Sequence, residues 1–194
     1  MYRGIKGTYL YACNKELRDY LKRHVETFKK EIPFRILHFD EVKPYVNSVP
    51  IYDIKVAATN FTDPQFYPEF NWVELPMQVT PRKGYFIAQV IGESMNKKIP
   101  NLSYCLFEEY TGGSRNGEIV LAECTNIQDG DYGSGYTIKE YSSVKKFNDE
   151  SFLHESIILK PLSFDNNYEN IVLEIDETVE FKVKGIFKRV LYWD

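Results

Sequence analysis

Short runs of β-branched and aromatic residues, separated by turn signals, fill most of the chain after residue 49. Such runs are typical of strands, because these side chains pack well on a pleated surface. The strongest runs span residues 85–91, 104–108, 118–124, 135–141, 156–160 and 179–191. Gly112-Gly113 and the stretch from Asp129 to Gly135 indicate two exposed loops. We therefore expect a mainly β domain over residues 46–194, with a twisted, partly closed, barrel-like sheet.

Residues 1–45 have a different pattern. Residues 8–11 are β-prone, Asn14 is a typical N-cap, and apolar residues then recur at helical spacing. A helix is predicted over 15–30, ended by Pro33 and followed by an extended segment over 34–39. Pro44 and Pro50 bracket a linker, so a small α/β segment is expected before the β domain.

The composition suits one ordinary domain with an appendage. The chain has 194 residues, of which 43% are hydrophobic and 15% aromatic, enough to build a core. A formal net charge of -4 argues against a surface that as a whole matches nucleic acid. A basic stretch does occur at Lys22, Arg23, Lys29 and Lys30. A solvated helix face is the favoured interpretation of this stretch, and direct nucleic-acid binding stays an alternative.

Neither a membrane span nor a secretory signal is recognisable, so we expect a cytoplasmic protein. The three cysteines, Cys13, Cys105 and Cys124, suit a reducing compartment better than a disulfide framework. The three histidines, His24, His38 and His154, have no acidic or thiol residue at ligand spacing, and structural or surface roles are expected. The sequence therefore predicts no metal and no cofactor.

Ser94 is a candidate nucleophile. It follows an apolar strand directly, and Gly92 permits a sharp turn that would bring backbone N–H groups close to the hydroxyl. Such groups stabilise the oxyanion of an acyl-transfer reaction, and the amides of Ser94 and Met95 are the candidates. Taken alone, however, a serine after a glycine at a strand end is most often an ordinary turn residue.

Lys139 is the candidate base, because no histidine is suitably linked to an aspartate. A lysine acts as a general base only as the neutral amine, which burial in apolar surroundings favours. Lys139 lies mid-strand between Ile138 and Tyr141, whereas Lys145 and Lys146 lie in a polar stretch. On composition alone, a surface lysine on a strand remains the commoner alternative.

Several segments in order resemble the LexA/UmuD family of self-cleaving serine peptidases. Residues 86–95 with Ile99-Pro100-Asn101 are similar to its nucleophile motif, and residues 137–141 to its catalytic-lysine strand. Residues 116–122 and 183–187 resemble two further strands of the family, and residues 157–162 with Tyr168 and Ile171 resemble another of its segments. The resemblance covers about residues 49–190. It implies a LexA-type fold, a Ser94 nucleophile and a Lys139 base.

The resemblance also implies a substrate within the chain. Self-cleaving members cut an Ala-Gly bond upstream of the serine, and Ala58, 36 residues before Ser94, occupies that place. The sequence departs from the family's pattern in three ways. Thr59 replaces the glycine, Asn101-Leu102 replaces an acidic-Gly turn, and the 45 residues from Ser94 to Lys139 exceed the usual spacing. Thr59 adds bulk and β-branching at the scissile bond, and we expect it to slow or abolish cutting.

Residues 2–13 with 16–21 resemble the last conserved block of superfamily 1 helicase-like ATPases, where an arginine at the position of Arg3 reaches the nucleotide phosphates. No Walker A loop is present, so ATP hydrolysis by this chain alone is not expected. The alternatives are the end of an ATPase-peptidase fusion, a standalone descendant, or an unrelated strand and helix.

The predicted function is a Ser-Lys peptidase that cleaves its own chain after Ala58, in a DNA-damage or defence role. The rival from another class is a binding or dimerisation module that keeps the fold and no longer cuts. Relatives pair through C-terminal strands, so a homodimer through residues 179–191 is a further hypothesis. Cleavage of another protein in trans also stays open.

Overall fold

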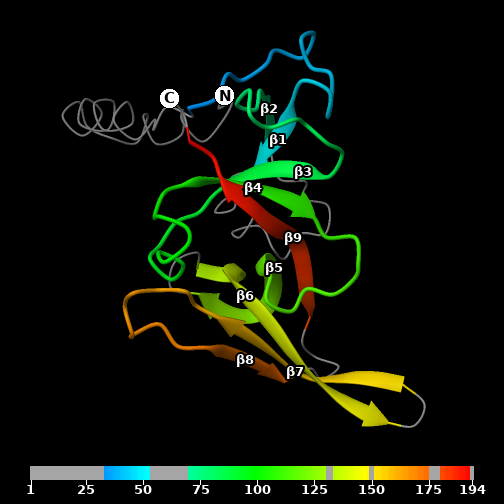
Figure 1. The fold of residues 1–194 in the computed structure, drawn as a ribbon, viewed down its shortest axis with the longest axis vertical. Helices are drawn as coiled ribbons and strands as arrows, with labels where there is room; N and C mark the ends of the chain where they lie inside the picture. Colours follow the sequence, from blue (N-terminus) through cyan, green and yellow to red (C-terminus); the bar gives the residue numbers. More distant parts are fainter. Residues whose placement is uncertain (1–32, 53–69, 130–132, 149–150, 175–179, 193–194) are drawn as a thin grey trace, which may run out of the picture. The chain divides into compact units, whose positions relative to one another are not determined.

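The computed structural model describes residues 33–52, 70–129, 133–148, 151–174 and 180–192. Strands dominate this part of the chain, and no α-helix occurs in it, which confirms the prediction of a mainly β protein. Figure 1 shows the strands: β1 (Val49–Tyr52), β2 (Phe70–Val73), β3 (Tyr85–Gln89), β4 (Tyr104–Glu109), β5 (Ile119–Asp129), β6 (Gly133–Asn148), β7 (Ser151–Lys160), β8 (Ile171–Glu174) and β9 (Phe181–Val190).

The six predicted runs correspond to β3, β4, β5, β6, β7 and β9. The exposed loop expected from Asp129 to Gly135 is wrong for most of its length. β5 continues to Asp129, β6 begins at Gly133, and these two residues pair with each other. Antiparallel hydrogen bonding thus extends the ladder through glycines that the pattern indicated as turn residues. Gly112 and Gly113 do lie in an exposed loop, both at positive φ.

All nine strands belong to one mixed sheet, in the order β2-β1-β3-β4-β9-β5-β6-β7-β8. β1 and β3 are parallel, with Tyr52 opposite Ala88, and every other pairing is antiparallel. β2 and β8 stand at the two ends of this order. Within the described ranges the sheet is therefore open, with no strand pairing that closes it into a barrel.

β6 changes its partner half-way along. Gly133 to Glu140 pair with β5, and Glu140 to Asn148 pair with β7, whose last residue, Lys160, lies opposite Glu140. In Figure 1 the far half of the β6–β7 hairpin extends beyond the neighbouring strands. The pairing of β7 with β6 therefore ends immediately beside Lys139, and the chain after Lys160 no longer follows β6.

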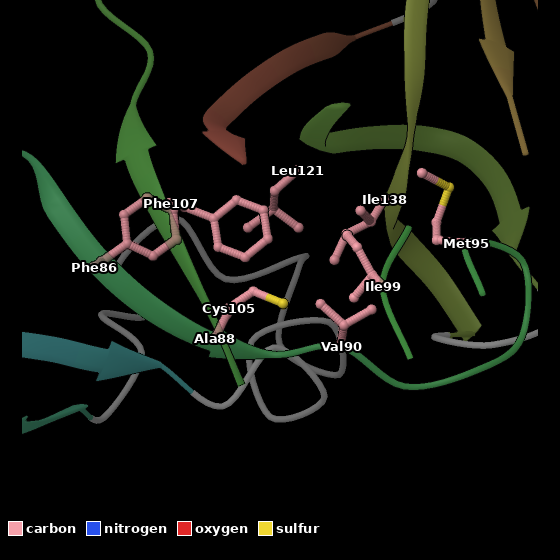
Figure 2. Close-up of a cluster of buried hydrophobic side chains, with 9 residues drawn as sticks. All are labelled: Phe86, Ala88, Val90, Met95, Ile99, Cys105, Phe107, Leu121 and Ile138. Carbon is pink, nitrogen blue, oxygen red and sulfur yellow. The ribbon is translucent and has the colours of Figure 1, made fainter. Parts of the chain in front are cut away.

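Buried side chains gather in two clusters, one on each face of β5. Leu121 belongs to the first, and Val120, Ala122 and Cys124 to the second, as strand alternation requires. The rest of the first cluster is Phe86, Ala88, Val90, Met95, Ile99, Cys105, Phe107 and Ile138 (Figure 2). The rest of the second is Tyr141, Ile157, Leu159 and Leu173. The first part of β5, Ile119 to Ala122, is a continuous apolar run because side chains on both faces of the strand pack into these clusters.

β9 lies inside the sheet. It pairs with β4 from Gly185 to Val190 and with β5 from Phe181 to Ile186. Homodimerisation through residues 179–191 stays a prediction. In this arrangement the backbone of β9 already pairs on both edges, so a dimer contact there would use side chains.

The residues from Ile36 to Asp194 form one compact unit. Ile36 makes a bridge to Val73, and the Leu37 amide donates to the Trp72 carbonyl at 2.9 Å, so this stretch lies along β2. The helix predicted over 15–30 lies outside the described residues. Of the predicted α/β segment, residues 33–45 are described, and the extended segment expected over 34–39 contributes only the isolated bridge at Ile36 to the sheet. The boundary between residues 45 and 46 stays a prediction. In the described ranges, no helix has the length and apolarity to cross a membrane.

Candidate active site

The chain turns sharply after β3, at the position of the predicted nucleophile motif. Gly92 has a φ of 101°, in the left-handed region that glycine adopts without steric cost. Its amide donates to Oδ1 of Asn101 at 2.9 Å, and the Val90 amide donates to the Ser103 carbonyl at 2.8 Å. These bonds close a loop over residues 91–102. The sharp turn predicted at Gly92 is therefore confirmed.

A single helical turn follows the bend and anchors it. The amides of Lys98 and Ile99 donate to the Met95 carbonyl, at 2.9 and 2.8 Å. Met95 and Ile99 are both buried in the first cluster, where Figure 2 shows them next to Ile138 of β6. Burial of these two side chains fixes the backbone immediately after Ser94 against the sheet.

Ser94 and Lys139 meet inside the protein. Nζ of Lys139 lies 3.0 Å from Oγ of Ser94, a hydrogen-bond distance. Ser94 is only 4% exposed and Lys139 only 3%, although 45 residues separate them in sequence. Lys139 is thus a buried residue and not the surface lysine that composition alone favoured.

Thr137 also contacts the amine of Lys139. It precedes Lys139 by two positions on β6, so both side chains project from the same face of the strand. Oγ1 of Thr137 lies 3.0 Å from Nζ of Lys139, and Thr137 is fully buried. Thr137 was not among the predicted site residues. Its one signal in the sequence is a hydroxyl two positions before the lysine.

The segment over residues 161–164 joins the two halves of the site. It begins where β7 leaves β6, next to Lys139. The Leu162 amide donates to the Ser94 carbonyl at 2.9 Å, and the Lys97 amide donates to the Leu162 carbonyl at 2.9 Å. The nucleophile turn is therefore tied by its backbone to the strand pair that carries Lys139.

The two backbone amides beside the Ser94 hydroxyl remain available. The N–H groups of Asn96, Lys97, Lys98 and Ile99 are all used within the loop or by the 161–164 segment. Those of Ser94 and Met95 donate to no other residue that the structure describes. They are the two amides that the sequence suggested for an oxyanion, and both are adjacent to the Ser94 hydroxyl.

The departure at Asn101-Leu102 has a structural counterpart. Leu102 has a φ of 66°, in the left-handed region that favours glycine. The Asn101 side chain accepts the Gly92 amide and so takes part in closing the loop. The turn thus keeps a backbone form suited to glycine although leucine stands there.

The remaining candidates lie apart from this site. Cys105 and Cys124 are buried free thiols, and burial raises the pKa of Cys105, which makes that thiol a poor nucleophile. His38 is an exposed surface residue, as predicted, with Nδ1 2.5 Å from Oδ1 of Asp40. Among the described side chains, no group of acidic, thiol and imidazole residues is placed to hold a metal ion.

Several predicted residues fall outside the described ones. The proposed cleavage site, Ala58 and Thr59, lies in the range 53–69. Arg3, the basic stretch at Lys22, Arg23, Lys29 and Lys30, and the residues Cys13 and His24 lie in the range 1–32. The side chain of His154 is likewise not described. The interpretations of these residues stay predictions.

No protein-family model matches the chain, and no curated protein matches it.

Proposed function

We propose that this protein is a serine endopeptidase of the LexA/UmuD type, with a LexA-type fold, in which Ser94 is the nucleophile and Lys139 the general base. One observation carries the proposal, the 3.0 Å separation of Nζ and Oγ in a buried site. A buried amine in contact with a hydroxyl at the end of a turn is the arrangement that a Ser-Lys pair requires. The ordered resemblance of the surrounding segments supports the same function.

In the first half of the reaction, the neutral amine of Lys139 takes the proton of the Ser94 hydroxyl as Oγ attacks the carbonyl carbon of the scissile bond. The carbonyl oxygen becomes an oxyanion, which accepts hydrogen bonds from the amides of Ser94 and Met95. As the C–N bond breaks, the ammonium of Lys139 returns the proton to the leaving amine, and an ester to Ser94 remains. Water, deprotonated by Lys139, hydrolyses this ester and regenerates Ser94.

The proposed substrate is the Ala58-Thr59 bond of the same chain. Tyr52 and Ala88 are paired in the parallel register of β1 and β3. Ala58 and Ser94 each follow those paired residues by six positions, so the tether permits the two to meet. An intramolecular bond is presented at high effective concentration, which compensates for a weakly activated nucleophile.

The biological setting follows from the resemblance alone. Cleavage after Ala58 would separate the segment that resembles a helicase-like ATPase from the β domain. Such a cut is suited to a cytoplasmic regulatory switch in a DNA-damage or mobile-element defence response, with an ATPase module as a partner.

The test is self-cleavage of the purified protein, followed on gels as loss of the full-length chain. We expect first-order loss of the wild-type chain, because Lys139 lies within hydrogen-bond reach of the Ser94 hydroxyl. Lys139→Met keeps an unbranched side chain without the amine and should abolish cleavage. If Lys139→Met is cleaved at the wild-type rate, Lys139 is not the general base.

Two further comparisons define the substrate. A first-order rate constant that does not change on dilution indicates cleavage in cis, and one that falls indicates cleavage in trans. Thr59→Gly removes the β-branched side chain after the scissile bond and should accelerate cleavage about tenfold or more. If neither wild type nor Thr59→Gly is cut, the rival function, a non-cleaving binding module, replaces the peptidase.

A further inference from the structure

A second polar side chain of the nucleophile turn, Asn96, connects this turn to the 161–164 segment. Nδ2 of Asn96 donates to Oε2 of Glu93 at 2.9 Å. Oδ1 of the same amide accepts the backbone N–H of Phe164 at 2.8 Å. The side chain therefore spans from the residue before Ser94 to the end of the neighbouring segment.

We infer that Asn96 is a positioning residue for the Ser94 nucleophile, acting through Glu93 and the 161–164 segment. The inference rests on the proposed peptidase function. Three hydrogen bonds join the turn to this segment, and two of them are between backbone groups of Ser94, Lys97 and Leu162. The third bond is accepted by the Asn96 side chain. It is therefore the only one of the three that depends directly on the side chain at position 96.

The amide group is needed for both contacts at once. A carboxamide offers one donor and one acceptor on the same carbon, which matches a carboxylate on one side and an N–H on the other. An aspartate at position 96 keeps an oxygen that could accept from Phe164, but repulsion between its charge and that of Glu93 would move the side chain and weaken this contact. Residue 96 is therefore matched to the charge of Glu93 as well as to the backbone of Phe164.

The effect on catalysis follows from the position of Ser94. Glu93 is the residue directly before it, and the backbone amide of Asn96 donates a further hydrogen bond to the Glu93 carbonyl, at 3.3 Å. The side-chain and backbone contacts between Asn96 and Glu93 therefore fix the backbone on both sides of Ser94, which carries Oγ. A small displacement of a nucleophile from its base costs much of the rate, because attack requires close and aligned atoms.

A charge-matched pair of substitutions tests this role. Asn96→Asp alone should slow self-cleavage about tenfold, through repulsion by Glu93. Glu93→Gln alone keeps a side-chain carbonyl that accepts from Asn96, and its rate is the reference for the double variant. When Glu93→Gln and Asn96→Asp are combined, the carboxamide now at position 93 donates to the carboxylate now at position 96, and Phe164 keeps its acceptor. The rate of this double variant should therefore return to within about twofold of that of Glu93→Gln.

Asn116 provides the matched control. Its side-chain oxygen accepts hydrogen bonds from the amide and hydroxyl of Ser143, at 3.0 and 3.2 Å, and Ser143 lies on β6 and not on the nucleophile turn. Asn116→Asp should change the melting temperature as little as Asn96→Asp and leave the rate unchanged. A rate loss in Asn96→Asp that the double variant does not rescue would overturn the inference.

A measurement that does not depend on cleavage separates this inference from the proposed function. Amide hydrogen exchange by NMR should be faster at Phe164, Leu162 and Lys97 in Asn96→Asp, and should recover in the double variant. If wild type is not cut but exchange behaves in this way, the peptidase function fails and Asn96 still fixes the turn. Unchanged exchange at all three amides overturns the positioning role whether or not cleavage occurs.

Discussion

At the scale of single residues, the site depends on where one amine is held. Lys139 is 3% exposed and has hydrogen-bond contacts to Ser94 and Thr137, both at 3.0 Å. The Thr137 hydroxyl is therefore well placed to orient Nζ toward Oγ of Ser94. Orientation matters because proton transfer in the proposed reaction requires hydrogen-bond reach between the base and the nucleophile.

Thr137→Val should slow self-cleavage about tenfold, because it replaces the hydroxyl by a methyl group of similar shape and removes one contact of the amine. The free energy of unfolding should fall by only about 1 kcal/mol. The rate is measured by loss of full-length chain, and the stability by urea unfolding of the Ser94→Ala background. Thr80→Val, at an exposed threonine, should change neither quantity. An unchanged rate in Thr137→Val would contradict the orienting role.

Local sequence pattern could predict the identity of these residues only in part. The period of two along a strand places Thr137 and Lys139 on one face, but it does not tell whether that face is buried or which loop covers it. The pairing with Ser94 came from the order of several segments that resemble one family. The contact of Leu162 with the nucleophile turn depends on where β7 ends, which no local pattern indicates.

At the scale of elements, the runs that were predicted are those with strong apolar content. β3 and β4 are buried along much of their length, as is β5 from Val120 to Ala122, and these segments are clearly predicted as strands. β1, β2 and β8 have four residues each, too short for a periodic signal. The insertion of β9 between β4 and β5 is a long-range pairing, and the pattern of β9 itself does not specify its neighbours.

Gly185 shows how closely these elements pack. It lies in β9, and a Cβ there would meet Cζ of Phe86 at 2.6 Å and Cβ of Phe107 at 3.2 Å. Gly185→Ala should therefore lower the free energy of unfolding by about 1–3 kcal/mol, through overpacking between β9, β3 and β4. Urea unfolding of the variant and its parent measures this change in free energy. Lys182→Ala, at an exposed position of the same strand, is the control and should change stability little. Equal stabilities of the two variants would contradict the close approach.

At the scale of the whole molecule, one half-buried hydroxyl links stability to alkaline pH. Burial, together with the charge and the hydrogen bond of Glu123, raises the pKa of Tyr136 from 10.0 to about 12. Ionisation of Tyr136 is thus less favourable in the folded than in the unfolded chain. The stabilising contribution is fully present below pH 10 and is lost as the pH rises toward 12.

Tyr136→Phe removes this group and should make the alkaline decline in stability between pH 10 and 12 less steep. This decline is measured as the midpoint of thermal unfolding at each pH, in the Ser94→Ala background to prevent cleavage. Tyr192→Phe, at an exposed tyrosine, is the control and should leave the decline as it is. Identical alkaline profiles for Tyr136→Phe and its parent would contradict the linkage.

The central claim is that Ser94 attacks a bond of its own chain. The most direct measurement is the intact mass of purified protein incubated at mildly alkaline pH, for wild type and Ser94→Ala side by side. The proposed reaction predicts two new masses in the wild type, for residues 1–58 and 59–194, and none in Ser94→Ala. The same two masses in Ser94→Ala, or no cleavage in the wild type, would contradict it.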